Sequence, residues 1–238
     1  MKPMRRLRET LVVATVAACI AAAPEALAQR RKPIPPEETH VVPVPTVEDF
    51  ALAAHNDRVD IVRALLARGM DPNTVGPDGN PVLVTAAREG SLRVVEALLA
   101  AGAKVDMANP WGDTALKLAA LQGRLEVAKR LLARGAVIDP PGWTPLIYAA
   151  TGGHDAMVEY LLAQGANLDA VSPNGTSALM MAVREQKFST AMLLIDRGAN
   201  VNHRNENGAS ALDWALRSED EALAERLKRA GAGASKRP

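Results

Sequence analysis

Residues 142–165, with the sequence GWTPLIYAATGGHDAMVEYLLAQG, decide the fold of this chain. Thr144 can cap a helix, and Pro145 stands in the first turn, where proline is tolerated. The apolar residues that follow at spacings of three and four share one face of a short helix, and a second set does the same after Gly153. Gly165 supplies a left-handed residue that ends the second helix. The stretch therefore predicts a helix-turn-helix unit with one apolar side.

The same unit recurs along the chain at an almost constant spacing. One set of glycines stands three residues after a pair of leucines or their equivalents, at spacings of 33, 33, 30, 33 and 33 residues. A second set precedes the first helix of the units, at spacings of 33, 30, 33 and 33. The first set is Gly69, Gly102, Gly135, Gly165, Gly198 and Gly231, and the second is Gly79, Gly112, Gly142, Gly175 and Gly208. Because one unit cannot bury its apolar face alone, the repetition predicts a stack with a shared core.

The unit resembles the ankyrin repeat. In that family the motif Thr-Pro-Leu-His is followed by alanines, and here residues 144–147 read TPLI and are followed by Ala149 and Ala150. Weaker copies begin at Thr114, Ser177 and Ser210, and the most divergent copy begins at Pro81. The resemblance covers roughly residues 46–234. It implies an all-α solenoid of helix-turn-helix units joined by short β-hairpin-like loops.

Six units are expected, at about residues 46–76, 77–109, 110–139, 140–172, 173–205 and 206–234. The motif histidine is absent, and its place is taken by Val84, Lys117, Ile147, Met180 and Asp213. The hydrogen bond between threonine and histidine that is typical of the family is therefore missing. We expect a somewhat less rigid solenoid, held more by apolar contact.

The first 28 residues have the organisation of an export signal. Basic residues occupy positions 2–8, an apolar run covers 11–23, and the small-x-small pattern of residues 26–28 marks a cleavage site. We expect cleavage after Ala28 and a mature protein in the periplasm or outside the cell, with no membrane insertion after cleavage. A lipoprotein anchored through Cys19 is the less favoured alternative, because the apolar run continues past that residue. A retained N-terminal anchor is a further alternative.

Residues 29–45 are interpreted as a proline-rich linker, and residues 235–238 as a disordered tail. Prolines at positions 33, 35, 36, 43 and 45 prevent helix and favour extended chain. We interpret the linker as a tether for the repeat domain, residues 46–234. A docking motif for a proline-binding groove is the alternative.

Composition and motifs argue against nucleic-acid binding and against catalysis. Removing the signal leaves 24 basic and 25 acidic residues, a net charge of −1, whereas a nucleic-acid partner requires a basic surface. His40, His55, His154 and His203 are the four histidines, and they show no metal-ligand spacing. The sequence contains no phosphate-binding glycine loop and no nucleophile elbow. We therefore expect no enzyme activity, no metal and no cofactor.

The resemblance implies that a protein partner binds to the hairpin tips and to the exposed side of each first helix. By register, that surface comprises Arg88, Glu89, Trp111, Asp113, Leu121, Gln122, Trp143, Thr151 and Arg184. Because aromatic residues make up 3% of the chain, tryptophans on two adjacent hairpins indicate an interface anchor exposed on one face. Alternatively, the two tryptophans pack on each other and on nearby prolines. Trp214 takes an inward register position and is expected in the core of the last unit.

The three-residue deletion shared by both glycine sets falls between Asp139 and Gly142. The deletion predicts a notch in the row of hairpins that could receive a loop of a partner protein. The alternative is a variation in repeat length that has no functional consequence. The resulting hypothesis is a monomeric adapter or scaffold for a protein partner of unknown identity. The alternatives are a dedicated protective or inhibitory partner of one exported enzyme, and a lipid-anchored structural envelope protein.

Overall fold

A computed structural model describes residues 45–233 of the chain. The predicted signal, the predicted tail and all of the predicted linker except its last residue lie outside the described residues. Between residues 45 and 233 the chain forms twelve helices in six consecutive pairs, and each expected unit contains one pair. The predicted all-α fold is confirmed.

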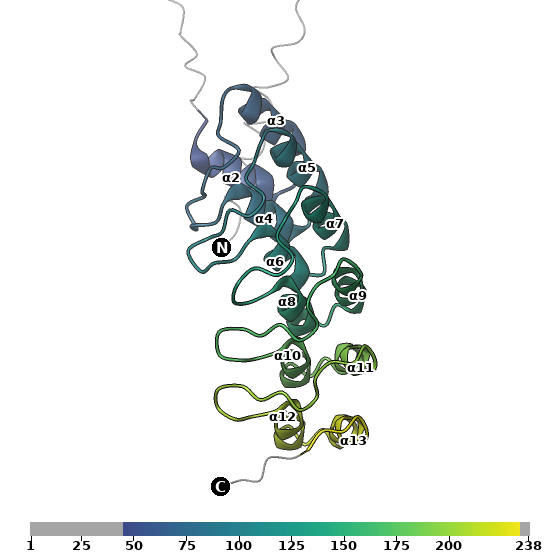
Figure 1. Ribbon diagram of the computed structural model, residues 1–238. Helices are drawn as coiled ribbons and strands as arrows, with labels where there is room; N and C mark the ends of the chain where they lie inside the picture. The colour runs from purple at the N-terminus through teal and green to yellow at the C-terminus, as the bar shows by residue number, and fades with distance from the viewer. Residues whose placement is uncertain (1–44, 234–238) are drawn as a thin grey trace, which may run out of the picture. The chain divides into compact units, whose positions relative to one another are not determined.

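The helices form two layers, and the loops between successive pairs project from one side of the stack (Figure 1). The inner helices are α2 (Val47–His55), α4 (Val82–Glu89), α6 (Ala115–Leu121), α8 (Pro145–Gly152), α10 (Ala178–Arg184) and α12 (Ala211–Arg217). The outer helices are α3 (Val59–Ala67), α5 (Leu92–Ala100), α7 (Leu125–Ala133), α9 (Asp155–Ala163), α11 (Phe188–Asp196) and α13 (Glu221–Arg229). Each inner helix packs against its own outer helix, and each except α12 packs against the inner helix of the next unit.

The inner helices begin where the sequence places a short hydroxyl side chain. In five of the six, this side chain accepts a hydrogen bond from the backbone N–H three residues further on, which satisfies a donor that the helix cannot pair internally. The five capping residues are Thr46, Thr114, Thr144, Ser177 and Ser210. The divergent copy begins at Pro81, which has no hydroxyl and caps α4 without a side-chain bond.

The core runs along the stack between the two layers. The first residue of each leucine pair is buried, and from the second unit onward it is fully enclosed. From α4 onward the alanines of the inner helices, such as Ala149 and Ala150, are also buried. Small side chains there let neighbouring inner helices approach closely, and the larger leucines fill the space between the layers.

The residues at the position of the missing histidine behave in different ways. Val84, Ile147 and Met180 are buried in the core, which agrees with the expectation of more apolar contact. Lys117 instead donates a hydrogen bond from Nζ to the Gly112 carbonyl oxygen, at 2.8 Å. Asp213 completes a capping box at the start of its own helix. Its backbone N–H donates to the Ser210 side chain, and its carboxylate accepts from the Ser210 backbone N–H. Polar side chains thus tie the loop to the inner helix in two of the five units.

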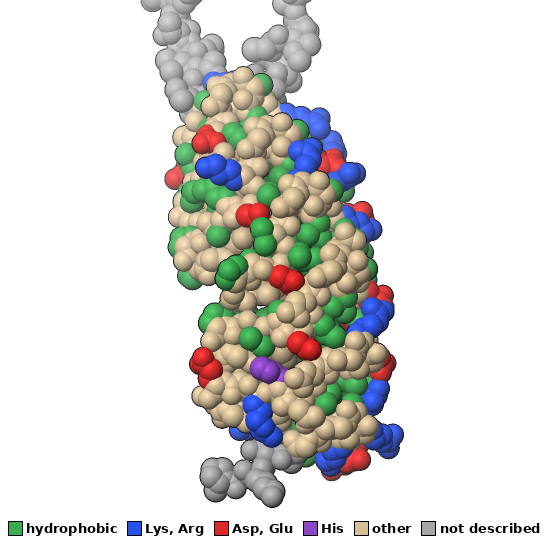
Figure 2. Space-filling model, viewed as in Figure 1, with side chains coloured by type: hydrophobic (Ala, Val, Ile, Leu, Met, Phe, Trp, Pro, Cys, Tyr) green, Lys and Arg blue, Asp and Glu red, His purple; other side chains and the backbone are tan. Residues whose placement is uncertain are grey.

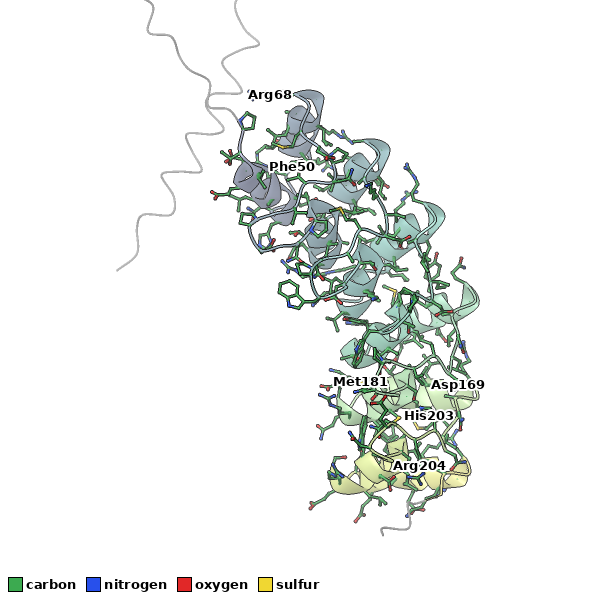
Figure 3. All side chains as sticks on the ribbon, turned by 60° about the vertical axis from the view of Figure 1, so that its left-hand side comes forward. Phe50, Arg68, Asp169, Met181, His203 and Arg204 are labelled. Carbon is green, nitrogen blue, oxygen red and sulfur yellow. The ribbon has the colours of Figure 1, made fainter. Side chains whose placement is uncertain are left out.

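A ladder of side-chain acceptors connects the loops of successive units. In each of five loops, the residue four positions after the first-set glycine accepts a hydrogen bond from a backbone N–H of the next unit, at 2.8–3.0 Å. The acceptors are Asn73, Asp106, Asp139, Asp169 and Asn202, and the donors are the N–H groups of Lys104, Val137, Asn167, Asn200 and Gly233. A further contact between units joins His203 to the Gly175 carbonyl oxygen at 2.7 Å, and Figure 3 shows Asp169 and His203 in this part of the stack. This ladder fixes the spacing of the loops.

We call the loops that join one pair to the next the fingers; they are residues 68–81, 101–114, 134–144, 164–177 and 197–210. Isolated antiparallel bridges close three of them, at Val75 with Pro81, Val171 with Ser177, and Arg204 with Ser210. The predicted hairpin-like form is therefore present. The finger at 134–144 is three residues shorter than the others, as the deletion requires, and Figure 1 shows the loop before α8 projecting less far than its neighbours.

Candidate partner-binding surface

The predicted site residues lie along two rows on the inner side of the stack. Trp111, Asp113 and Trp143 belong to the fingers, at the N-terminal ends of inner helices. The other six residues lie at the C-terminal ends of α4, α6, α8 and α10. The inner helices lie between the two rows, and the residues of α4, α6 and α10 that separate the rows are buried.

Trp111 stands at the tip of the second finger with 72% of its surface exposed, the highest fraction of any large hydrophobic residue between positions 45 and 233. Its backbone is held in place: the side-chain oxygen of Asn109 accepts from the N–H groups of Trp111 and Asp113, at 3.0 and 2.8 Å. Asn109 is itself buried, and its amide donates to the side-chain oxygen of Asn80 in the previous finger at 2.9 Å. A rigid backbone thus presents an indole to solvent.

Trp143 does not share the environment of Trp111. Its side chain is only half-exposed and packs against the core. Its ring meets the ring of Tyr148 edge to face, with centroids 6.1 Å apart and an interplanar angle of 80°. Trp143 is therefore less exposed than Trp111 but is not fully buried, and its part in an anchor with Trp111 stays a prediction. The deletion shortens its finger, and the indole packs on Tyr148 of the inner helix of its own unit.

Tyr148 links the third and fourth units through a polar cluster. Its hydroxyl donates a short hydrogen bond to the carboxylate of Asp113. Burial is the main reason that the pKa of Tyr148 lies above its ordinary range, and the bond to Asp113 raises it further. Burial also lowers the pKa of the Lys117 ammonium group, and the charge of Asp113 partly offsets that effect. The cluster therefore brings the Asp113 carboxylate, the Tyr148 hydroxyl and the Lys117 ammonium group together beside the finger that carries Trp111.

Tyr148 should remain protonated well above pH 10, the usual pKa of tyrosine. Because its folded-state pKa is raised, the stability that it contributes is fully present below pH 10 and is lost as the pH rises through the folded-state value. Phenolate absorbance of the folded chain, followed against pH, should contain a late step that is absent from Tyr148→Phe. A step near pH 10 that disappears in this variant would contradict the prediction.

The row at the C-terminal ends of the inner helices is more polar. Arg88 and Glu89 form a half-buried ion pair at 2.9 Å, and Glu89 also lies 3.4 Å from His55. Leu121 is partly buried, and its carbonyl oxygen lies 2.9 Å from Nε2 of His154 in the next unit. The Thr151 hydroxyl donates a hydrogen bond to the Ile147 carbonyl oxygen of its own helix. The Gln122 side chain is exposed to solvent. The row is accessible, but its strongest contacts are internal.

An open groove of about 570 Å³ lies at the C-terminal end of the same surface. It is lined by Val183, Arg184, Asn205, Asn207, Ala209, Trp214, Arg217 and Ser218. Trp214 therefore differs from its prediction, because it is half-buried: one side packs on the core and another borders this groove. The smaller Leu118 and Met181 occupy the same register position and are buried. Tyr148, the other aromatic residue at this register position, is half-buried like Trp214, and no following unit in the described part of the chain covers Trp214.

Half-buried Tyr148 and buried Lys117 also belong to this region, and neither was predicted as part of it from the sequence. Lys117 is one of the residues that replace the motif histidine, but its bond to the Gly112 carbonyl oxygen was not predicted. Tyr148 is 35 residues from Asp113, and only the packing of two units brings them together. Three or more His, Cys, Asp or Glu side chains that could hold a metal are not found together anywhere between residues 45 and 233. No helix in this range is long and apolar enough to cross a membrane.

Comparison with known proteins identifies the repeat. The family model described as ankyrin repeats (3 copies) matches residues 50–141, 83–172 and 146–237, which together include almost the whole described stack. A search of the curated proteins found no match for the chain.

Proposed function

Because the chain belongs to the ankyrin-repeat family, which forms protein-interaction modules, we propose that it is an adapter or scaffold that binds its partner around Trp111. The observation that carries this proposal is the 72% exposure of Trp111 on a finger whose backbone is fixed by Asn109. A rigid, exposed indole can be buried by a partner at little entropic cost, and tryptophans of this kind dominate the energetics of many interfaces.

The residues around Trp111 support specificity for a polypeptide. Asp113 offers a charge that is partly shielded from solvent, and Lys117 is buried beside it. The ring of Trp143, which packs against the core, is the second aromatic ring next to this group. Arg88, Glu89, Gln122, Thr151 and Arg184 would form the rim of the same contact. Rim charges mainly set the association rate and the discrimination between partners.

We further propose that the protein acts after export, in the periplasm or outside the cell. The support is the order of a basic segment, an apolar run and a small-x-small pattern in residues 1–28. The mass of the chain recovered from its source cell tests this. A mature chain that begins at Gln29 agrees with the proposal, a lipidated Cys19 favours an anchored envelope protein, and an uncut chain in the cytoplasm contradicts it.

The test of the binding surface is affinity capture from an envelope extract of the source cell with the tagged full chain. Trp111→Ala should weaken partner retention about 30-fold, the factor that corresponds to a loss of about 2 kcal/mol at an interface hot spot. The matched control is Phe188→Ala, which removes an aromatic side chain 46% exposed on an outer helix and should leave retention unchanged.

The outcomes separate the proposals. Equal retention by wild-type protein and Trp111→Ala would place the contact elsewhere, and no retained protein with any version would contradict the adapter function. A single partner held in one exclusive complex would favour the protective or inhibitory role.

A further inference from the structure

The fingers of the stack cover one another in a regular way. Pro110 lies over Gly79 of the preceding finger, where a Cβ atom would come within 3.4 Å of the proline Cγ. Pro173 lies over Gly142 in the same manner, at 3.7 Å from such an atom. Gly175 is covered by the backbone of Asn205. At three of the five tips, the next finger therefore closes the space above the glycine.

Gly112 is the exception inside the stack. A Cβ atom on it would meet no atom within 4 Å, and the residue is exposed, whereas Gly79, Gly142 and Gly175 are half-buried. The cause is the short finger at 134–144, which ends three residues too early to reach over Gly112. Figure 2 shows an indentation in the left-hand edge of the stack, at the level where Figure 1 shows the short loop before α8.

The open position above Gly112 has a defined chemistry. Gly112 is flanked in the chain by Trp111, whose indole is largely exposed, and by Asp113, which is half-buried. The carboxylate of Asp113 accepts from Tyr148 but has more lone pairs than this one bond uses. The backbone N–H of Gly112 is already paired with the Asn109 carbonyl oxygen at 2.9 Å. The position thus offers an apolar ring and an anionic acceptor to an incoming group.

We propose that this position accepts a proline-containing turn of the partner protein, whose ring lies over Gly112 as Pro110 lies over Gly79 and Pro173 over Gly142. The inference rests on the proposed function and names the chemistry that the notch recognises. Proline fits because it has no N–H to leave unsatisfied against the paired backbone of Gly112, and because its ring packs well on an aromatic face. A backbone N–H beyond the proline would donate to Asp113. The partner's turn would replace the finger tip that the deletion removed.

The test uses a cyclic peptide that contains Ser-Pro-Asn-Gly-Thr, the sequence of the chain's own tip at residues 172–176. It is titrated into the full chain while the indole N–H of Trp111 and the amide N–H of Gly112 are followed by NMR. Both signals should shift, and the peptide with alanine in place of proline should bind about tenfold more weakly. The absence of a shift at about 10 mM peptide, or equal binding of the alanine peptide, would overturn the inference.

Two variants fill the notch without removing Trp111. Gly112→Asn places a side chain in the open space, and asparagine tolerates the positive φ of 80° at this position. The second variant inserts three residues between Asp139 and Gly142 and so restores the finger to full length. Both variants should bind the proline peptide about tenfold more weakly than the wild-type chain does. The matched control is Gly208→Asn, since Gly208 has a φ of 71° and is equally uncovered, but stands at the last finger.

The same variants separate this inference from the proposed function. If a captured partner is lost with Trp111→Ala but retained undiminished by Gly112→Asn and by the lengthened finger, the adapter function stands and the proline-turn inference fails. If all three lose the partner and Gly208→Asn keeps it, both stand.

Discussion

Replacing Leu161 by alanine is expected to lower the free energy of unfolding by about 2–5 kcal/mol. Leu161 lies in α9 near the middle of the stack and is fully buried. Its truncation removes buried apolar surface and leaves a cavity between the two helix layers. Because the units on both sides hold these layers in place, the surrounding structure cannot collapse to fill the cavity. Chemical denaturation followed by circular dichroism measures the change.

The matched control for this prediction is Leu162→Ala, in the same helix and with the same chemical change. Leu162 is only half-buried, so its truncation should cost clearly less. Equal losses for the two variants would show that helix propensity, and not the buried core position, governs the stability of α9.

Replacing Phe50 by alanine is expected to cost about 3–5 kcal/mol, but to act locally. Phe50 is fully buried in α2, the first inner helix of the described stack, and α2 packs against α3 and α4. In a solenoid each unit contacts only its neighbours, so an end unit can unfold while the rest persists. Hydrogen exchange should show lost protection in α2 and α3, with protection retained from α6 onward.

Leu52→Ala provides the comparison for Phe50→Ala, because Leu52 lies in the same helix with 60% of its surface exposed. It should leave the exchange pattern of α2 unchanged. Loss of protection along the whole stack in Phe50→Ala would contradict the local mode and would indicate that the six units unfold as one.

The secondary structure and the number of units could be predicted from the sequence because they depend on local chemistry that repeats. A hydroxyl residue before an apolar run caps a helix whatever its neighbours are, and Thr144 and Ser177 do so as expected. The glycines that end the outer helices likewise act within a few residues of themselves. The acceptor ladder from Asn73 to Asn202 has the same 33- and 30-residue spacing and was also readable, although its purpose required knowledge of which units touch.

The surroundings of the large side chains could not be predicted in this way. The sequence treats Trp111 and Trp143 alike, since each stands beside a glycine of the second set, on adjacent fingers. The structure exposes the first and packs the second on Tyr148. The deletion between Asp139 and Gly142 shortens the finger that carries Trp143, and its place is readable in the sequence. The contact of the indole with Tyr148 depends on how that finger packs, which the spacing of residues does not give.

The sequence by itself therefore determined the helices, their ends, their repetition and the place of the missing three residues. Each of these follows from the conformational preferences of a few consecutive residues and from the spacing of apolar positions. Only the tertiary structure decided that Gly112 is uncovered, that Asp113 meets Tyr148, and that Trp214 borders a groove. These features depend on contacts between units about 30 residues apart, where the fit of one side chain depends on the size and length of its neighbours.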